Sequence, residues 1–184
     1  KKQHKQNVEV VQLNNLITCD WNKKILIKTR APRVWDNNGQ PAGKPGWGNL
    51  VHTVLSWIRT GNDVGMALDK ATMEGLMDRQ ERKELERIIS QIINDNRLAR
   101  LFSGEVTVRT EAEILLPGGT FYRPDRVVFD GDLVTVIDYK SGKPGDEHRE
   151  QLKRYAGYLE EMGYQNIQRL LVYTGNEITV EEVG

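Results

Sequence analysis

The chain has 184 residues, 38% of them hydrophobic and 28% charged, which is typical of one soluble globular domain and excludes a disordered chain. Basic and acidic residues balance at 26 each, so net charge gives no general attraction to nucleic acid, and such binding must come from a local patch. Cys19 is the one cysteine, which excludes an internal disulfide and a cysteine-ligated metal site. No apolar run is long enough to span a membrane, so we expect a cytoplasmic protein.

Residues 1–45 are polar and irregular, with stretches rich in asparagine, proline and glycine. They predict an extended, irregular leading segment with one edge strand at residues 24–30, where Ile25 and Ile27 stand among lysines. Because the chain begins with Lys-Lys and no methionine, we expect it to be a piece of a longer protein. The folded domain is expected over residues 46–184.

Three helices are predicted next, at residues 48–60, 63–73 and 78–95. The first has apolar residues at helical spacing and ends at Gly61, and the second starts at an Asn-Asp pair. The third places leucine and isoleucine on one side and Glu, Lys and Arg on the other. We therefore expect a helical segment ahead of any sheet.

The second half of the chain alternates apolar and polar residues and is rich in β-branched types. It predicts strands at residues 105–117, 121–130 and 133–140, a helix at 147–162, and strands at 167–174 and 177–183. Asp130-Gly131 is a hairpin signal, and the last strand has the character of an edge strand. This order predicts an α/β (α+β) domain with a mixed central β-sheet flanked by helices.

The segment VIDYKSG, residues 136–142, ends an apolar strand with an acid and a base. Residues two apart on a strand share a face, so Asp138 and Lys140 follow Val134 and Val136 on a face that was apolar. We interpret the pair as leaving the core for a cleft, where strand ends often hold a site. The alternative is a surface ion pair of little consequence.

A second candidate acid is Asp125, in the segment YRPDRVVFD on the preceding strand. A hairpin between the two strands places it opposite residues 136–138, so two carboxylates can lie close together. Such acids repel each other unless a cation shares them, and Mg²⁺ or Mn²⁺ suits oxygen ligands. The alternative is that Asp125 pairs with Arg123 or Arg126.

Two further patterns lie on helices. Gln151 and Tyr155 are four residues apart and share a helical face, where an amide and a phenol can bind a phosphate or orient water. His52 lies at the edge of the first helix's apolar stripe. Taken alone, each pattern also fits an ordinary amphipathic helix. No P-loop and no serine nucleophile elbow is present.

The segments GNLVH at 48–52, RPD at 123–125, DYK at 138–140 and QLKRY at 151–155 together resemble the PD-(D/E)xK nuclease superfamily. Their order is similar to the RecB-type nuclease domain at the C-terminus of UvrD-like, AddA-type helicase–nucleases, over residues 46–175. The resemblance implies a restriction-endonuclease-like core and an Mg²⁺-dependent exodeoxyribonuclease acting in double-strand-break repair and recombination. It also implies linear DNA delivered as a single strand, a helicase part in the same polypeptide, and an AddB-like second subunit.

The resemblance carries a role to each matching residue. The metal ligands are His52, Asp125 and Asp138, with the backbone carbonyl of Tyr139 as a further ligand. Lys140 orients or activates the attacking water, while Gln151 and Tyr155 hold the lysine, the water or the DNA backbone. Candidate phosphate contacts are Lys143, Arg149, Lys153 and Arg154, and the segment RLAR at 97–100, for each of which a solvated charged face is the alternative.

The chain departs from its relatives in one respect. Related AddB-type nucleases use four cysteines for an iron–sulfur cluster, which one cysteine excludes here. Neutral net charge fits a module that receives DNA from a helicase. Two alternatives to the exonuclease remain: a catalytically silent nuclease-fold module that binds DNA or a partner subunit, and a different phosphodiesterase on the same fold, such as a structure-specific RNA or repair nuclease.

Overall fold

The computed structural model describes residues 46–115, 119, 121–175 and 177–184. The predicted leading segment, its edge strand at 24–30 and Cys19 lie outside the described residues, so the domain boundary at 45/46 stays a prediction. No helix within the described ranges is long and apolar enough to cross a membrane.

Four α-helices form close to the predicted positions. They are α1 (Trp47–Trp57), α2 (Val64–Met73), α3 (Arg79–Asn94) and α4 (Asp146–Glu161), with short 3-10 turns η2 (Gly61–Asp63) and η3 (Ala99–Phe102). Asp78 caps α3 because its carboxylate accepts hydrogen bonds from the backbone N–H groups of Gln80 and Glu81, both at 2.9 Å. The predicted leucine and isoleucine stripe of α3 is buried.

The first helix ends three residues earlier than predicted. Ile58 is already extended, and the chain makes the turn η2 before α2 begins. The cause is tertiary, because the backbone carbonyls of Ile58 and Arg59 accept hydrogen bonds from the Arg126 guanidinium, each at 2.7 Å. Carbonyls bound by a distant side chain no longer continue the helix, and helical periodicity does not reveal such a contact.

The strands are β1 (Thr107–Thr110), β2 (Ile114–Leu115), β3 (Phe121–Tyr122), β4 (Arg126–Asp130), β5 (Leu133–Lys140), β6 (Asn166–Thr174) and β7 (Ile178–Glu182). Two predicted strands are each split in two. Glu111 has a left-handed backbone, with φ of 48°, and separates β1 from β2. Pro124 lies between β3 and β4, where its missing N–H removes a ladder donor.

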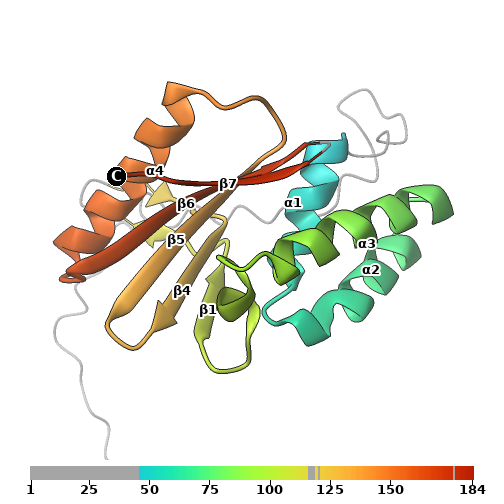
Figure 1. Ribbon diagram of the computed structural model, residues 1–184, viewed down its shortest axis with the longest axis horizontal. Helices are drawn as coiled ribbons and strands as arrows, with labels where there is room; N and C mark the ends of the chain where they lie inside the picture. Colours follow the sequence, from blue (N-terminus) through green and yellow to red (C-terminus); the bar gives the residue numbers. More distant parts are fainter. Residues whose placement is uncertain (1–45, 116–118, 120, 176) are drawn as a thin grey trace, which may run out of the picture. The chain divides into compact units, whose positions relative to one another are not determined.

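A mixed five-stranded sheet has the order β1-β4-β5-β6-β7, and β2 and β3 pair separately (Figure 1). β5 and β6 are parallel and α4 connects them, whereas the other neighbours are antiparallel. The predicted hairpin at Asp130-Gly131 is confirmed, with Arg126 opposite Ile137 in its register. β7 lies at the edge of the sheet, as predicted.

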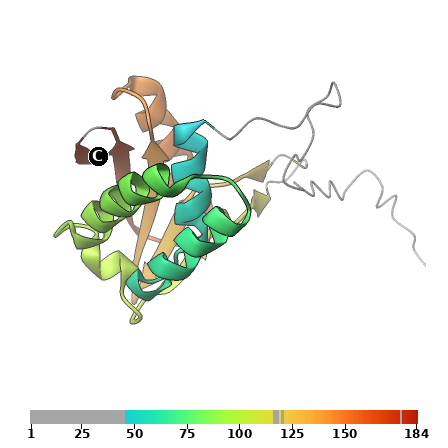
Figure 2. The ribbon, with the colours of Figure 1, turned by 90° about the vertical axis from the view of Figure 1, so that its right-hand side faces the viewer.

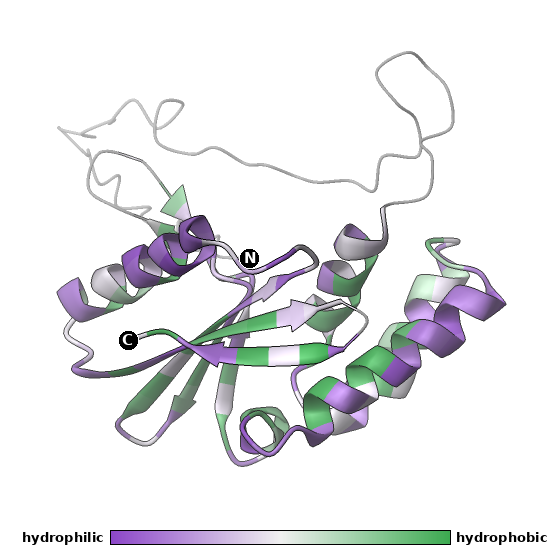
Figure 3. Cartoon of the chain, turned by 45° about the horizontal axis from the view of Figure 1, so that its top comes forward, coloured by the Kyte–Doolittle hydropathy of each residue, from purple (hydrophilic) through white to green (hydrophobic). Residues whose placement is uncertain are grey.

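Helices cover both faces of the sheet. One core packs α1, α2, α3 and η3 against a face that includes Ile137, Tyr139 and Val172 (Figure 2). The other packs α4 against the opposite face, which includes Val134 and Val136. Hydrophobic colour follows the strands, whereas α3 and α4 also carry hydrophilic residues (Figure 3). The mixed sheet flanked by helices is consistent with a restriction-endonuclease-like core.

Candidate active site

The carboxyl end of β5 brings Asp138 and Lys140 to the face covered by α4. Their alternation with Ile137 and Tyr139, which enter the other core, confirms the predicted period of two. Asp138 is only 3% exposed, and the Lys140 ammonium lies 2.6 Å from its Oδ2. The pair is therefore a largely buried one and not the surface ion pair of the alternative interpretation.

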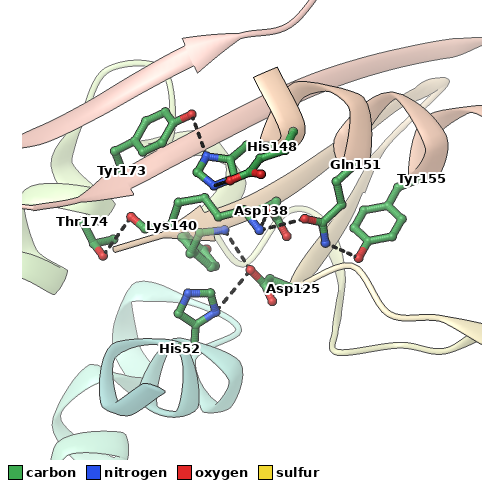
Figure 4. Close-up of polar contacts among 11 residues, drawn as sticks. His52, Asp125, Asp138, Lys140, His148, Gln151, Tyr155, Tyr173 and Thr174 are labelled. Atoms are coloured by element: carbon green, nitrogen blue, oxygen red, sulfur yellow. Dashed lines mark hydrogen bonds and ion pairs between the residues drawn. The ribbon is translucent and has the colours of Figure 1, made fainter. Parts of the chain in front are cut away.

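Lys140 is also held from the helix side (Figure 4). Its Nζ donates a hydrogen bond to Gln151 Oε1 at 2.9 Å, and Gln151 Nε2 donates to the Tyr155 hydroxyl at 2.7 Å. The Tyr155 ring is packed into the core beneath α4. The predicted helical face is thus part of the hydrophobic core and part of a polar chain that fixes the lysine.

Asp125 lies just before β4, across the hairpin from the end of β5. Its Oδ2 accepts a hydrogen bond from the Tyr139 backbone N–H at 2.8 Å. The Tyr139 carbonyl points to the same side of the strand, because a residue's N–H and C=O do so in a ladder. Arg123 instead lies 3.6 Å from Glu111, and Arg126 is buried against backbone carbonyls. Pairing of Asp125 with either arginine is therefore not found.

His52 reaches Asp125 from α1, on the other side of the sheet end. Its Nδ1 lies 3.4 Å from Asp125 Oδ2, and its ring meets Tyr139 edge-on. The hydrogen bond to Asp125 raises the pKa of His52, while burial opposes the shift. The structure thus brings His52, Asp125, Asp138, Lys140, Gln151 and Tyr155 to one end of the sheet.

The two carboxylates make this end of the sheet electrostatically costly. Burial, and next the negative charge of Asp125, raise the pKa of Asp138 to about 6, while Lys140 acts in the opposite direction. Asp138 Oδ2 is buried and accepts no hydrogen bond of good geometry within the described ranges, so Lys140 is its ionic partner. A further positive charge here would relieve both penalties.

The types of donor atom at this site suit a divalent cation, but the side chains that carry them are not gathered around one metal position. Among the described residues, no three His, Cys, Asp or Glu side chains converge closely enough to hold a metal ion. The donors present are nevertheless two carboxylates, an imidazole and a backbone carbonyl, and the buried Asp138 Oδ2 among them has the Lys140 ammonium as its ionic partner. Oxygen-rich sets of this kind suit Mg²⁺ or Mn²⁺.

The candidate phosphate contacts divide into two groups. Lys143 and Arg154 are exposed on the α4 side. Arg149 is paired with Asp146 and Glu181, and Lys153 lies 3.8 Å from Glu150. Both arginines of RLAR also have partners. Arg97 pairs with Asp95 and donates a hydrogen bond to the Val180 carbonyl. Arg100 pairs with Asp130 at the far turn of the β4–β5 hairpin. Arg100 therefore lies at the other end of the hairpin from Lys140, and a phosphate contact by RLAR stays a prediction.

Sequence reasoning missed three residues around Lys140, namely His148, Tyr173 and Thr174. His148 Nδ1 lies 3.3 Å from the Tyr173 hydroxyl, and Tyr173 is the partner of Lys140 in the β5–β6 register. Thr174 Oγ1 donates to the Lys140 carbonyl at 3.4 Å. A signal for His148 was available, because it lies three residues before Gln151 on the same helix. The β6 residues had none, because parallel pairing is not local.

Surface hollows do not identify the site. Two of them, of about 540 and 350 Å³, lie along α2 and are lined by residues such as Met66, Lys70 and Met73, and Trp57 and Arg59. Neither includes a residue of the polar chain around Lys140. The candidate site therefore rests on its chemistry and geometry.

Comparison with known proteins agrees with the geometry. The sequence profile of the PD-(D/E)XK nuclease superfamily matches residues 25–182. The fold is similar to a candidate exonuclease from Eubacterium rectale, with a TM-score of 0.50 and 12% identity, over 80% of this chain and 62% of that one. SSO0001 matches with a TM-score of 0.33 and 18% identity, over 71% and 65%. The chain thus spans less than two thirds of either protein, and no curated protein sequence matches it.

Proposed function

The chain belongs to the PD-(D/E)XK nuclease superfamily, and from this we propose that it hydrolyses phosphodiester bonds of DNA at the carboxyl end of β5. The observation that carries the proposal is the setting of Lys140. Its ammonium lies between a buried carboxylate, Asp138, and an amide, Gln151, which is itself anchored by Tyr155. A cation held in this way stabilises negative charge that develops on a phosphate without first having to reorganise.

The remaining site residues complete the chemistry of hydrolysis. His52, Asp125 and Asp138 would hold a divalent cation, with the Tyr139 carbonyl beside them. When bound, Mg²⁺ or Mn²⁺ supplies an acidified water and Lewis-acid stabilisation of the phosphate. Lys140 orients the attacking water and offsets charge on the phosphate, and Gln151 keeps the lysine in place.

We extend the proposal to an exonuclease module of a helicase–nuclease that acts in double-strand-break repair and recombination. Its support is the chain order of His52, Asp125, D-x-K at 138–140 and Q-x-x-x-Y at 151–155, which lie together in space. The proposed substrate is linear DNA delivered as a single strand. The proposed partners are a helicase part of the same polypeptide and an AddB-like subunit.

Cleavage of linear DNA tests the proposed activity. We expect the chain to degrade labelled linear DNA with Mg²⁺, and Asp138→Asn and Lys140→Ala each to lower the rate by about a hundredfold or more. Asp132→Asn and Lys83→Ala are matched controls, because both residues are exposed and lie outside the site. Undiminished cleavage by both site variants would remove the assignment of the site.

A silent nuclease-fold module that binds DNA or a partner subunit is the second candidate. It is favoured by one observation, namely that no three candidate ligands converge on a metal position within the described ranges. Calorimetric titration with Mn²⁺ separates the two functions. Binding that is lost in Asp125→Asn and Asp138→Asn favours the nuclease, whereas a folded protein without any heat of binding favours the silent module.

A further inference from the structure

Three tyrosines form a contiguous aromatic cluster beside the candidate site. The ring centroids of Tyr122, on β3, and Tyr158, on α4, are 4.7 Å apart, with their planes tilted by 33°. Tyr155 meets Tyr122 edge-on, with centroids 6.0 Å apart. The polar contact with Tyr122 also raises the pKa of Tyr158. Two elements far apart in the sequence thus build one aromatic surface.

This cluster is connected to Lys140 by a short series of contacts. Tyr155 accepts the hydrogen bond of Gln151, and Gln151 accepts that of Lys140 (Figure 4). From the other side, Tyr122 precedes Asp125 by three residues along the chain. A nucleotide whose phosphate lies at Lys140 would therefore have its neighbour within reach of these rings.

Burial and charge distinguish the outer two rings from the inner one. Tyr155 is buried in the core under α4, whereas Tyr122 and Tyr158 are half-buried and therefore partly accessible to solvent. Arg154 lies one helical turn before Tyr158, is exposed, and makes no ion pair or hydrogen bond with the residues that the structure describes. Half-exposed rings beside an unpaired cation are the combination by which proteins hold single strands.

We propose that Tyr122 and Tyr158 form a stacking platform for an unpaired nucleobase of the DNA strand that enters the site. The proposal rests on the proposed nuclease function and assigns its substrate as single-stranded at this position, because a paired base has its faces covered by its neighbours. Arg154 binds the adjacent phosphate. Every base has a π-face, so the platform accepts any sequence.

Binding of oligonucleotides with one missing base tests the platform. A labelled single strand of about 12 nucleotides, with an abasic position moved along it, is titrated with the full chain in EDTA and followed by fluorescence anisotropy. We expect one position at which loss of the base weakens binding about tenfold. Tyr158→Ala and Tyr122→Ala should bind intact strands more weakly and lose this dependence on position.

Further variants separate stacking from packing. Tyr158→Phe keeps the ring and should keep the profile, whereas Tyr158→Leu fills similar space without an aromatic face and should flatten it. Tyr164→Ala is the matched control, because Tyr164 is an exposed tyrosine that packs on Phe129 and not on the cluster. Thermal unfolding of each variant checks that the fold is kept.

Several outcomes overturn the platform: a flat profile or no strand binding by the wild-type chain, a wild-type profile in Tyr158→Leu, or an equal loss in Tyr164→Ala. Failure of the nuclease function looks different. If the chain does not cleave linear DNA but the position-dependent profile is intact, the platform stands and the activity does not. If cleavage is present and depends on Asp138 while the profile is flat, only the platform is lost.

Discussion

Lys140 is fixed from three directions. Its ammonium contacts Asp138 and Gln151, and its backbone carbonyl accepts a hydrogen bond from Thr174. A lysine side chain has four rotatable bonds, so holding it in one place normally costs conformational entropy. Here the contacts with neighbouring groups offset the conformational entropy lost by fixing the lysine. We therefore infer that Gln151 positions the lysine and does not itself react.

Substitutions along this chain should have graded effects. Gln151→Leu leaves the ammonium without its acceptor, and we expect kcat to fall about tenfold with little change in KM. Tyr155→Phe removes only the acceptor for the Gln151 amide and should cost less. The double variant should be no worse than Gln151→Leu, because both act through Lys140. Steady-state kinetics measure this, with Gln91→Leu on α3 as control, and additive losses would contradict a serial chain.

Helix α1 is attached to the sheet near both of its ends, and His52 lies between the two attachments. At its start, Gly48 packs against Ser141, the residue after Lys140, so closely that a Cβ at Gly48 would lie 2.9 Å from Ser141 Cβ and closer still to its Oγ. At its end, Arg126 binds the carbonyls that follow the helix. The distance between His52 and Asp125 is therefore set by packing remote from both residues.

The start of α1 can be tested with a compensating pair. Gly48→Ala should move α1 away from β5 and lower cleavage about tenfold or more, since small displacements in a site are costly. Ser141→Gly removes the atoms that the new Cβ would meet, so the double variant should recover activity and Mn²⁺ affinity by calorimetry. Gly65→Ala, on α2 with open space at its Cβ, is the control. Failure of Ser141→Gly to restore either property would contradict the steric argument.

The end of α1 depends on a buried arginine. Arg126 is fully buried, donates to the carbonyls of Ile58, Arg59 and Leu101, and lies over the Phe102 ring. Burial lowers the pKa of its guanidinium. It therefore joins α1, η3 and β4 into one unit at the cost of burying a charge.

Removing this arginine should destabilise the fold. Arg126→Met leaves two buried carbonyls and one part-buried carbonyl without this donor, and we expect a loss of about 3 kcal/mol in the free energy of unfolding. Urea denaturation measures the loss. Arg109→Met, at an exposed position of β1, should change stability by less than about 0.5 kcal/mol. Equal stability of the two variants would show that the carbonyl contacts contribute little.

The domain as a whole is built from two hydrophobic cores on opposite faces of one sheet, and Asp138 is buried beside one of them. A charged group in such a position lowers the stability of the folded state. The raised pKa of Asp138, about 6, expresses this cost. The site is thus maintained by the rest of the structure, as strained and polar functional sites commonly are.

Stability should therefore depend on pH and on Asp138. The folded state binds the proton of Asp138 more tightly than the unfolded chain does, so this contribution is present at low pH and is lost as pH rises from about 4 to about 6. Without metal at pH 7.5, Asp138→Asn should be more stable than wild type by about 1–3 kcal/mol. The difference should vanish near pH 3.5, where Asp138 is protonated.

Urea unfolding in EDTA at both pH values measures this difference. Asp132→Asn, in the exposed turn between β4 and β5, serves as control and should show no such gain. Adding Mn²⁺ should stabilise the wild type and not Asp138→Asn. If Asp138→Asn is the less stable protein at pH 7.5, the ion pair with Lys140 outweighs the cost of burial.

The helices and the β4–β5 hairpin were predictable because their signals are local. Apolar periodicity gave α3 and α4, the Asp130-Gly131 turn set a register that placed Asp125 opposite the end of β5, and alternation placed Asp138 and Lys140 on one face of the strand. The splitting of two strands was not predicted. Alternation continues through Glu111 although the backbone turns there, and Pro124 interrupts the ladder between β3 and β4.

Sequence by itself determined which residue types carry the chemistry. The spacing of D-x-K and of Q-x-x-x-Y places each pair on one face of a strand or helix, and the hairpin places the other acid on a paired strand. Tertiary structure alone decided how they meet: His52 against Asp125 from another layer, Gln151 between Lys140 and Tyr155, and Tyr173 beside the lysine on β6. The physical reason is the range of the interactions. Periodicity and turn geometry act over a few residues, whereas burial of charge and contact between α1, β5 and α4 exist only once both faces of the sheet are covered.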